Sequence, residues 1–368
     1  MTEHTTELPP QGPPPDRVGA AELERFIAGA LAATGLPEAD AGTVASLMVE
    51  ADLTGADAHG VFRLPQYVER IRAGGINPNP SIDVRRTGSG TAVVDGDNGM
   101  GHLVMSRAAE MAVSMAREAG IAWVAARRSN HAGSAGLYAA MAVPHGMIGI
   151  YSAVASANHM AVWGGREMLL GTNPLAVAIP CGDEPPIVLD MATTAVSYGT
   201  IKNYVLQGRR FPEGWMVDRT DGTPITDPAR AGDGMLLPIG GYKGSGLALI
   251  LGLLAGPLSG AAFGRDVVDF NADPVSETNT GHFILALDIA RFIPPVVFYG
   301  EVNRHLADLR ASERLAGCSS IRLPGDRRAS RRAERLAQGI PIPAPLLSRL
   351  NDLAASLSIP PLAVRSGA

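Results

Sequence analysis

The sequence predicts a mixed α/β protein in which a strand-rich middle lies between helical ends. Apolar residues recur at helical spacing near both ends of the chain. Between residues 121 and 189 the pattern changes to short runs rich in Val and Ile, bounded by Gly, Pro and Asn, which is typical of strands. No GxGxxG motif stands between a strand and a helix, so any nucleotide cofactor is not held by an ordinary Rossmann unit.

Composition excludes several classes of protein. The 368 residues are 46% apolar and 18% charged, with a net charge of −5, and this mild acidity offers no basic face for nucleic acid. Cys181 and Cys318 are too few for a disulfide framework and fit a reducing compartment. The most apolar stretch, residues 247–255, is too short to span a bilayer. We therefore expect a cytoplasmic globular protein with neither nucleic-acid nor membrane partners.

The N-terminal part predicts a tail followed by helices. Residues 1–16 are rich in Pro, Thr and Glu, without the basic start and apolar core of a signal peptide, and predict a disordered tail. A helix from residue 20 ends at Gly35, and a second covers about residues 39–53. Pro65 begins a third helix, which ends at Gly74.

The remaining elements lead to a division into domains. The pattern predicts strands at 91–94, 121–127, 147–154, 175–180, 186–192 and 282–289, and helices at 103–118, after 240–246, at 326–338 and at 346–357. We predict an N-terminal helical and substrate region (17–120), a cofactor-binding domain (121–300) and a C-terminal helical region (301–368). The last is expected to pack with the first, so that both ends of the chain build one outer domain.

The loop at residues 240–246, GGYKGSG, is a candidate anion site. Glycines let the backbone approach a ligand, the following helix offers free N–H groups, and Lys243 adds a positive charge. The spacing is not that of a Walker A loop, and a tight turn packing a helix onto a sheet is the alternative. Only two of the 31 basic residues are lysines, Lys202 and Lys243, so their positions are of interest.

Two histidines lie in loops suited to proton transfer. His59 is followed four residues later by Arg63, which is able to hold a carboxylate, and His131 follows a predicted strand. Asp190 ends another strand, where it would orient an imidazole, bind a ribose hydroxyl or cap the following segment. A hydrogen-bonded turn residue is the alternative for each histidine. No histidine pair has the spacing of a metal site.

Together these residues resemble the malate/L-lactate dehydrogenase family that lacks a Rossmann fold. The similar segments are DAHGVFRLPQYVERIRAGGINP (57–78), VDGDNGMGH (94–102), ARRSNHAGSAGLYA (126–139), GTNPLAVAIP (171–180), LDMATT (189–194), FPEGWMVDRTDGTPITDP (211–228), GGYKGSGLALILGLLAGPLSGAAFG (240–264), GHFILALDI (281–289) and LPGD (323–326). Their shared order over nearly the whole chain makes the resemblance specific.

The resemblance implies a non-Rossmann cofactor domain with a predominantly antiparallel sheet, NAD or NADP as cofactor, and a homodimer with sites near the subunit interface. By resemblance His59 and His131 match the family's active-site histidines, and Arg63 matches a contact to the substrate carboxylate. The residues that match segments contacting the dinucleotide are Ser156, Asp190, Met191, Ala192, Lys243, Pro324 and Gly325. The chain departs from the pattern at Ala58, where many members carry serine, and at Thr200, where imine reductases carry an acidic residue.

The resulting hypothesis is hydride transfer between nicotinamide and C2 of a small 2-hydroxy or 2-oxo acid, with His131, ahead of His59, exchanging the hydroxyl proton. Three alternatives remain open: a cyclic-imine reductase on the same scaffold, a phosphate-ligand binding protein without redox chemistry, and a metal-dependent hydrolase. The pattern at Thr200 favours hydroxy acids.

Overall fold

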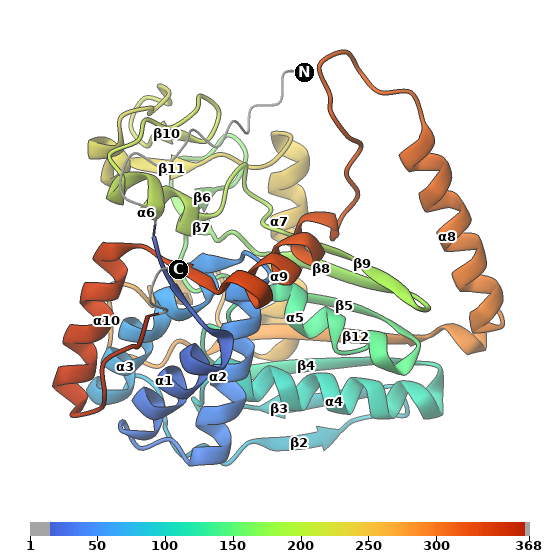
Figure 1. Cartoon of the computed structure of the whole chain (residues 1–368), viewed down its shortest axis with the longest axis horizontal. Helices are drawn as coiled ribbons and strands as arrows, with labels where there is room; N and C mark the ends of the chain where they lie inside the picture. The colour runs from blue at the N-terminus through green and yellow to red at the C-terminus, as the bar shows by residue number, and fades with distance from the viewer. Residues whose placement is uncertain (1–14, 365–368) are drawn as a thin grey trace.

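A computed structural model describes residues 15–364 of the chain (Figure 1). The helices are α1 (Ala20–Ala32), α2 (Glu38–Leu53), α3 (Leu64–Ala73), α4 (Gly101–Ala119), α5 (Ala135–Ala140), α6 (Tyr198–Leu206), α7 (Tyr242–Ala255), α8 (Pro295–Ala311), α9 (Asp326–Gln338) and α10 (Ala344–Leu357). The strands are β1 (Asp16–Val18), β2 (Asp83–Arg86), β3 (Thr91–Asp95), β4 (Ile121–Ser129), β5 (Met147–Ala153), β6 (Met160–Ala161), β7 (Met168–Leu170), β8 (Leu175–Cys181), β9 (Glu184–Met191), β10 (Met216–Asp218), β11 (Gly234–Leu236), β12 (Thr280–Asp288) and β13 (Ile340–Ile342). Of the predicted tail, residues 1–14 lie outside the described residues, and Asp16 already begins β1.

A seven-stranded sheet forms the centre of the molecule, in the order β2-β3-β4-β12-β5-β8-β9. Only β3 and β4 run parallel, so the expectation of a predominantly antiparallel sheet is confirmed. Both faces of the sheet are covered by helices, and side chains of one strand alternate between them. In β4, Val124 packs in the cluster that contains α4, whereas Trp123 packs against the cluster that contains α7.

The helices on the two faces differ in composition. Small residues of α4 and α5, mostly alanines, let these helices lie close to one face of the sheet. On the other face, α7 packs Leu251 and Ala255 against Phe283 of β12. Its sequence is apolar all round, and Leu249, Ile250 and Leu253 remain exposed.

A second layer contains helices from both ends of the chain, and we term it the outer layer. Helices α1, α2, α3 and α10 share one apolar core, and β1 pairs antiparallel with β13 through Val18 and Ile340. In Figure 1 the blue N-terminal helices and the red C-terminal helices lie side by side. Helix α9 packs on α2 and thereby connects the C-terminal region to the outer layer.

Two segments lie elsewhere than the predicted regions suggest. β2, β3 and α4 belong to the central sheet and its apolar cluster, although they fall within the predicted N-terminal region. Helix α8 lies at the edge of the molecule in Figure 1, contacts β8 and buries none of its own residues. The loop between α2 and α3 carries two of the predicted site residues, His59 and Arg63.

Candidate active site

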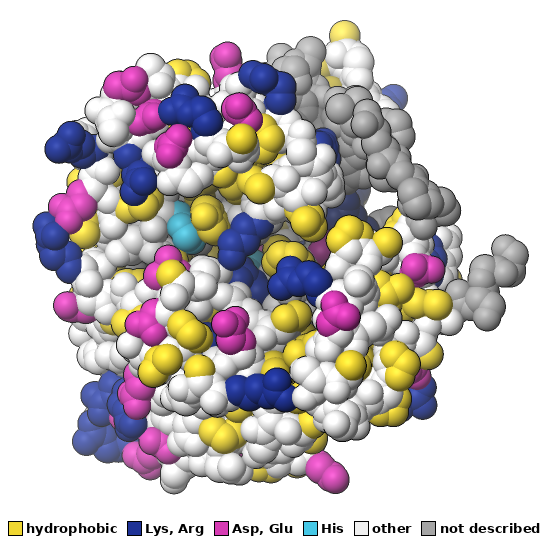
Figure 2. Space-filling model, turned by 90° about the vertical axis from the view of Figure 1, so that its left-hand side faces the viewer, with side chains coloured by type: hydrophobic (Ala, Val, Ile, Leu, Met, Phe, Trp, Pro, Cys, Tyr) yellow, Lys and Arg dark blue, Asp and Glu magenta, His cyan; other side chains and the backbone are white. Residues whose placement is uncertain are grey.

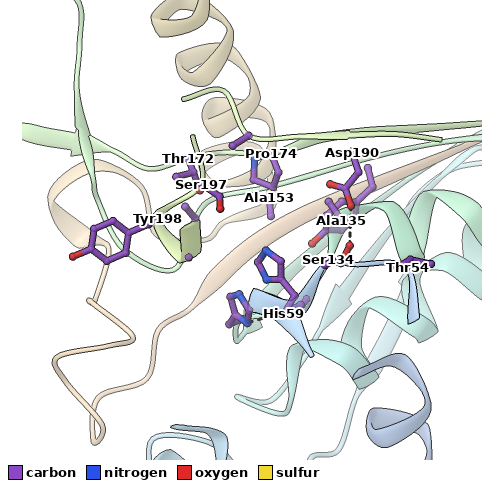
Figure 3. A pocket seen from close by; sticks show the side chains of 18 of the residues that line it. Thr54, His59, Ser134, Ala135, Ala153, Thr172, Pro174, Asp190, Ser197 and Tyr198 are labelled. Atoms are coloured by element: carbon purple, nitrogen blue, oxygen red, sulfur yellow. Dashed lines mark hydrogen bonds between the residues drawn. The ribbon is translucent and has the colours of Figure 1, made fainter. Parts of the chain in front are cut away.

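A cavity of about 670 Å³ lies between the central sheet and the outer layer. Figure 2 shows the hollow on one face of the molecule, with a histidine and several Lys or Arg side chains around it. His59, Arg63, His131 and Asp190 all line this cavity, so the fold brings together residues far apart in the sequence. Figure 3 places Tyr198 on one side of the pocket, Asp190 and Ser134 on the other, and His59 between them.

The loop that carries His59 and Arg63 is held from both ends of the chain. The buried carboxylate of Asp52 accepts a hydrogen bond of 2.8 Å from the backbone N–H of Val61. A Cβ atom at Gly60 would lie 1.9 Å from Oδ1 of Asp52, so this position requires glycine. From α9, Arg335 donates to the backbone carbonyl of Asp52 and to the Asp57 carboxylate.

His131 has a fixed orientation next to His59. Its Nδ1 lies 2.6 Å from the hydroxyl oxygen of Tyr67, which is completely buried. The two imidazole rings stack with their centroids 5.4 Å apart. Asn130 anchors the loop by donating to the backbone carbonyls of Asn98 and Gly99, each at 3.0 Å.

Both histidines are neutral near neutral pH. Burial, with the charge of the Arg63 guanidinium acting in the same direction, lowers the pKa of His59 to about 4. Burial also lowers the pKa of His131 well below its usual value, with the charge of Arg63 acting in the same direction. A neutral imidazole is able to accept a proton. Among the described residues Nδ1 of His59 has no hydrogen-bond partner, so a ligand is needed to satisfy it.

Arg63 is a buried cation without a carboxylate partner among residues 15–364. The residue is only 7% exposed. Nε donates to the carbonyl of Ala58 at 3.0 Å, and Nη1 donates to Gln66 at 2.8 Å and to Asn271 at 3.2 Å. The hydrogen bonds described for Arg63 thus leave the two Nη2 hydrogens for a ligand. Because burying an unpaired charge is costly, the arrangement indicates a bound anion.

A second basic side chain lies close to Arg63. Lys202 of α6 donates from Nζ to Oδ1 of Asn271 at 2.7 Å, and this is the oxygen that Arg63 also contacts. Lys202 lies 5.5 Å from the ring centroid of Tyr198, which in turn stacks on His159 with centroids 3.7 Å apart. Burial lowers the pKa of Lys202 to about 8, and the charge of Arg63 contributes to this shift.

Asp190 caps a helix at the other side of the cavity. Its Oδ2 accepts hydrogen bonds of 2.8 Å from both the Ser134 hydroxyl and the Gly136 backbone N–H, at the start of α5. Arg328 of α9 contacts the same oxygen at 3.2 Å. Of the three roles considered from sequence, capping thus occurs, although at α5 rather than at the following segment. No hydrogen bond to an imidazole is formed among the described residues.

This side of the cavity, which we term the arginine end, consists of Asp190 with Arg327, Arg328 and Arg331 of α9. Arginines in the first two turns of a helix are unusual, because the helix dipole already places partial positive charge there. Such a concentration of positive charge suits a polyanion such as the phosphates of a dinucleotide. The size of the cavity is also within the range of small-molecule and cofactor sites.

The predicted cofactor residues divide into two groups. Ser156, Asp190, Ala192, Pro324 and Gly325 line the cavity, whereas Met191 and Lys243 do not. Lys243 is exposed in the first turn of α7. Most of the segment 240–246, which was predicted as a loop before this helix, belongs to α7 itself. Because Lys243 does not line the cavity, its contact with the cofactor stays a prediction that this structure does not support.

Sequence reasoning did not single out several residues of the cavity. His159 and Asn271 belong to loops without a motif, and the arginines of α9 read as an ordinary charged helix face. The one signal that was present is the set of arginines that begins two residues after the Pro-Gly pair preceding α9. Within residues 15–364, no group of three His, Cys, Asp or Glu is arranged to hold a metal ion. In the same residues no helix is long and apolar enough to cross a bilayer.

The cavity thus has the features of a site for an anionic ligand with neutral proton acceptors beside it. Comparison with known proteins identifies the family: the family described as malate/L-lactate dehydrogenase matches residues 18–351, and the chain belongs to it. Its members are NAD(P)-dependent dehydrogenases of 2-hydroxy acids, so the chain is an enzyme of this class. This excludes the alternative of a binding protein without redox chemistry.

Several relatives cover almost the whole chain. It is 38% identical to malate dehydrogenase from Pyrococcus horikoshii, over 93% of this chain and 96% of the relative. The solved structure of that protein matches with a TM-score of 0.87, covering 96% of this chain and 99% of the other. L-sulfolactate dehydrogenase from Methanothermobacter thermautotrophicus is 36% identical, over 93% and 98% of the two chains. A Δ1-pyrroline-2-carboxylate/Δ1-piperideine-2-carboxylate reductase from Pseudomonas putida is 32% identical, over 92% and 96%.

Proposed function

We propose that the cavity oxidises a small 2-hydroxy acid and reduces the corresponding 2-oxo acid, with Arg63 holding the carboxylate and His131 exchanging the proton. The observation that carries the proposal is the buried, unpaired guanidinium of Arg63 beside two neutral histidines. A carboxylate on the Nη2 hydrogens would neutralise this charge with strong hydrogen bonds. It would also fix the position of C2 relative to the histidines.

His131 acts as the base in the direction of oxidation. As the C2 hydrogen leaves with its electron pair, the hydroxyl proton passes to the neutral imidazole and the C=O bond forms. In the reverse direction the same imidazolium returns the proton to the oxygen. Tyr67 supports this role because its hydroxyl group holds Nδ1 and fixes the plane of the ring.

The nicotinamide cofactor, when bound, supplies or accepts the hydride. Ser156, Ala192, Pro324 and Gly325 line the cavity where they would contact it. The arginine end would bind its phosphates, and Asp190 would contact a ribose hydroxyl while it caps α5. NAD and NADP both fit this proposal.

The enzyme is proposed to be a cytoplasmic homodimer. Exposed apolar side chains on α7, including Ile250 at 54% exposure, would be covered by a second subunit. Cys181 and Cys318 are both free, which agrees with a reducing compartment.

A substrate panel tests the function. The purified full-length enzyme is incubated with NADH or NADPH and a series of 2-oxo acids and cyclic imines, and loss of the reduced cofactor is followed by absorbance. We expect turnover of 2-oxo acids. Turnover of piperideine-2-carboxylate alone would show the cyclic-imine alternative instead, and no turnover with any compound would contradict the proposal.

A further inference from the structure

Alternating residues of three strands form one wall of the cavity, next to the start of α5, and we term it the strand wall. It consists of Tyr151 and Ala153 of β5, Thr280 and His282 of β12, and Val188 and Asp190 of β9. Alternate side chains of a strand point to the same face of the sheet, and three of these residues share the apolar cluster that contains α5. The polar members of the wall therefore face the same ligand.

The hydroxyl group of Tyr151 gives its proton to His282. Oη of Tyr151 lies 2.8 Å from Nδ1 of His282, and Nε2 lies 3.1 Å from Oγ of Ser129, which donates to the carbonyl of Asn130 at 3.3 Å. Burial lowers the pKa of His282 to about 3, so the ring is neutral and has one N–H, and the Asn130 carbonyl stabilises a proton on it. These contacts assign the proton to Nε2, so Nδ1 accepts from Tyr151. The phenol offers a ligand the lone pairs of its oxygen.

The hydroxyl group of Thr280 has the same polarity. It donates to Oγ1 of Thr278 at 3.0 Å, and Thr278 donates to the carbonyl of Ser129 at 2.9 Å and to the amide oxygen of Asn130 at 3.1 Å. Both final acceptors are carbonyl oxygens, which have no proton to donate, so the direction of this chain is fixed. Together with the carboxylate of Asp190, the strand wall thus presents hydrogen-bond acceptors to the cavity.

From this arrangement we propose that Tyr151 binds the carboxamide of nicotinamide by accepting a hydrogen bond from its NH2 group, and that His282 is the positioning residue that keeps Tyr151 an acceptor. The inference rests on the proposed function, in which the nicotinamide reacts beside His131. A wall of acceptors suits a ligand that carries donors. The phosphates of a dinucleotide only accept and the pyridine ring has no N–H or O–H group, so the carboxamide NH2 is the donor nearest to the reacting carbon.

The interactions of Tyr151 toward both ends of the strand wall support the carboxamide rather than a ribose hydroxyl. On one side its partner His282 is close enough to His131 to act on the pKa of that imidazole. On the other side the charge of Asp190 acts on Tyr151 itself, whose pKa burial raises, so the phenol keeps its proton for His282. The order His131, Tyr151, Asp190, arginine end then matches reacting carbon, carboxamide, ribose and phosphates. A ring held by its carboxamide presents one face to the substrate.

The test compares cofactors that differ only in the substituent of the nicotinamide ring. Dissociation constants of the full-length enzyme and of Tyr151→Phe are measured by calorimetry for NADH, for its thionicotinamide analogue, which keeps the NH2 group, and for its 3-acetylpyridine analogue, which has a methyl group instead. The NADP series is used if NADPH binds more tightly. We expect the wild-type enzyme to bind the first two about 5- to 10-fold more tightly than the acetyl analogue, the effect of one hydrogen bond. In Tyr151→Phe this preference should fall below about twofold, with little change for the acetyl analogue.

Tyr138→Phe is the matched control. Tyr138 is also buried and its ring lies 5.2 Å from that of Tyr151, but its hydroxyl group donates to the carbonyl of Ala132 and it does not line the cavity. This variant should keep the wild-type preference. His282→Leu tests the positioning role, because the freed Tyr151 proton would face the ligand and reduce the preference for NH2. Thermal unfolding of each variant monitors the fold, which a ratio of two affinities does not report.

Three outcomes would overturn the inference. Equal affinity of the wild-type enzyme for the three cofactors would show that the NH2 group has no partner. Equal losses for all three cofactors in Tyr151→Phe would mean a contact to another part of the cofactor. An unchanged preference in His282→Leu would remove the positioning role. Turnover of 2-oxo acids with an unchanged preference in Tyr151→Phe refutes this inference alone, whereas neither binding nor turnover with NADH and NADPH would contradict the proposed function itself.

Discussion

The two ends of the cavity deal with charge in opposite ways. Beside His59 and His131, desolvation keeps both imidazoles neutral, and the positive charge next to them is that of the buried Arg63 guanidinium. At the arginine end, Arg327, Arg328 and Arg331 of α9 line the cavity, and Arg328 forms an ion pair with Asp190. Burial changes a pKa strongly, whereas exposed charges mainly attract ions. This difference supports the proposal that proton transfer takes place at the first end and that the cofactor phosphates bind at the second.

The largest effect is expected from His131→Asn. Removing the group that exchanges the substrate proton should lower kcat by about 10²- to 10⁴-fold, with little change in cofactor affinity. Steady-state kinetics with the best 2-oxo acid measures this, with exposed His305→Asn as control. If His59→Asn has the larger effect on kcat, the roles of the two histidines are exchanged. If both variants keep wild-type turnover, neither is the base.

At the arginine end, Arg331→Met should weaken cofactor binding about tenfold and leave kcat nearly unchanged, because a contact to phosphate is lost but no reacting group. Fluorescence titration with NADH and NADPH measures the dissociation constants. Arg332→Met is the neighbouring control, since Arg332 is exposed and forms an ion pair with Glu50 at 2.8 Å. Equal losses in the two variants would argue against a specific contact at Arg331.

Tyr67→Phe tests the orientation of His131. Losing the hydroxyl group should lower kcat by about fivefold, the effect of one net hydrogen bond, and should shift the acidic limb of the pH profile of kcat/KM. Tyr138→Phe, whose hydroxyl group bonds a backbone carbonyl instead, serves as the comparison. A pH profile identical to that of the wild-type enzyme would exclude a role for Tyr67 in setting the protonation of His131.

The smallest effect concerns stability in acid. Burial lowers the pKa of His102 to about 3, so the folded chain binds fewer protons than the unfolded chain, and stability should fall as pH drops below about 6.5. His102→Leu removes one such group, and should reduce the loss of Tm between neutral pH and about pH 5 by on the order of 3 °C. The exposed His305→Gln should not alter the slope. Calorimetry at several pH values measures how Tm depends on pH. If this dependence is the same in His102→Leu as in the wild-type enzyme, the prediction is wrong.

Local pattern predicts much of this molecule. The helix over 326–338 is found with the bounds predicted. Six of the seven strands of the central sheet differ from prediction mainly at their ends, whereas the edge strand β2 was not predicted. Helical periodicity and Val-rich runs depend on neighbours in sequence, so they are readable from sequence. The short strands β1 and β13 were missed because each has three residues and exists only through the other.

Residues of the candidate site were predictable where they belong to a sequence motif. Contacts that arise only from tertiary packing were not predictable. His59, Arg63 and His131, which line the cavity, were singled out because they stand in predicted loops and in segments that resemble a known family. The bond between Tyr67 and His131 and the shared contact of Lys202 with Asn271 join loops far apart in sequence. No periodicity or spacing encodes such contacts, because they depend on how the outer layer is placed on the sheet.

The hydrogen bonds from Arg335 to the loop that carries His59 have a consequence for folding during synthesis of the chain. Arg335 is among the last described residues to be made, yet it holds the segment that carries two active-site groups made much earlier. The central sheet is complete once β12 has been synthesised, but the loop gains the contacts of Arg335 only when α9 has been made. A nascent chain that ends before α9 therefore contains the whole central sheet but lacks the Arg335 contacts to the loop that carries His59. We therefore expect enzyme activity to require α9 and not only a folded central sheet.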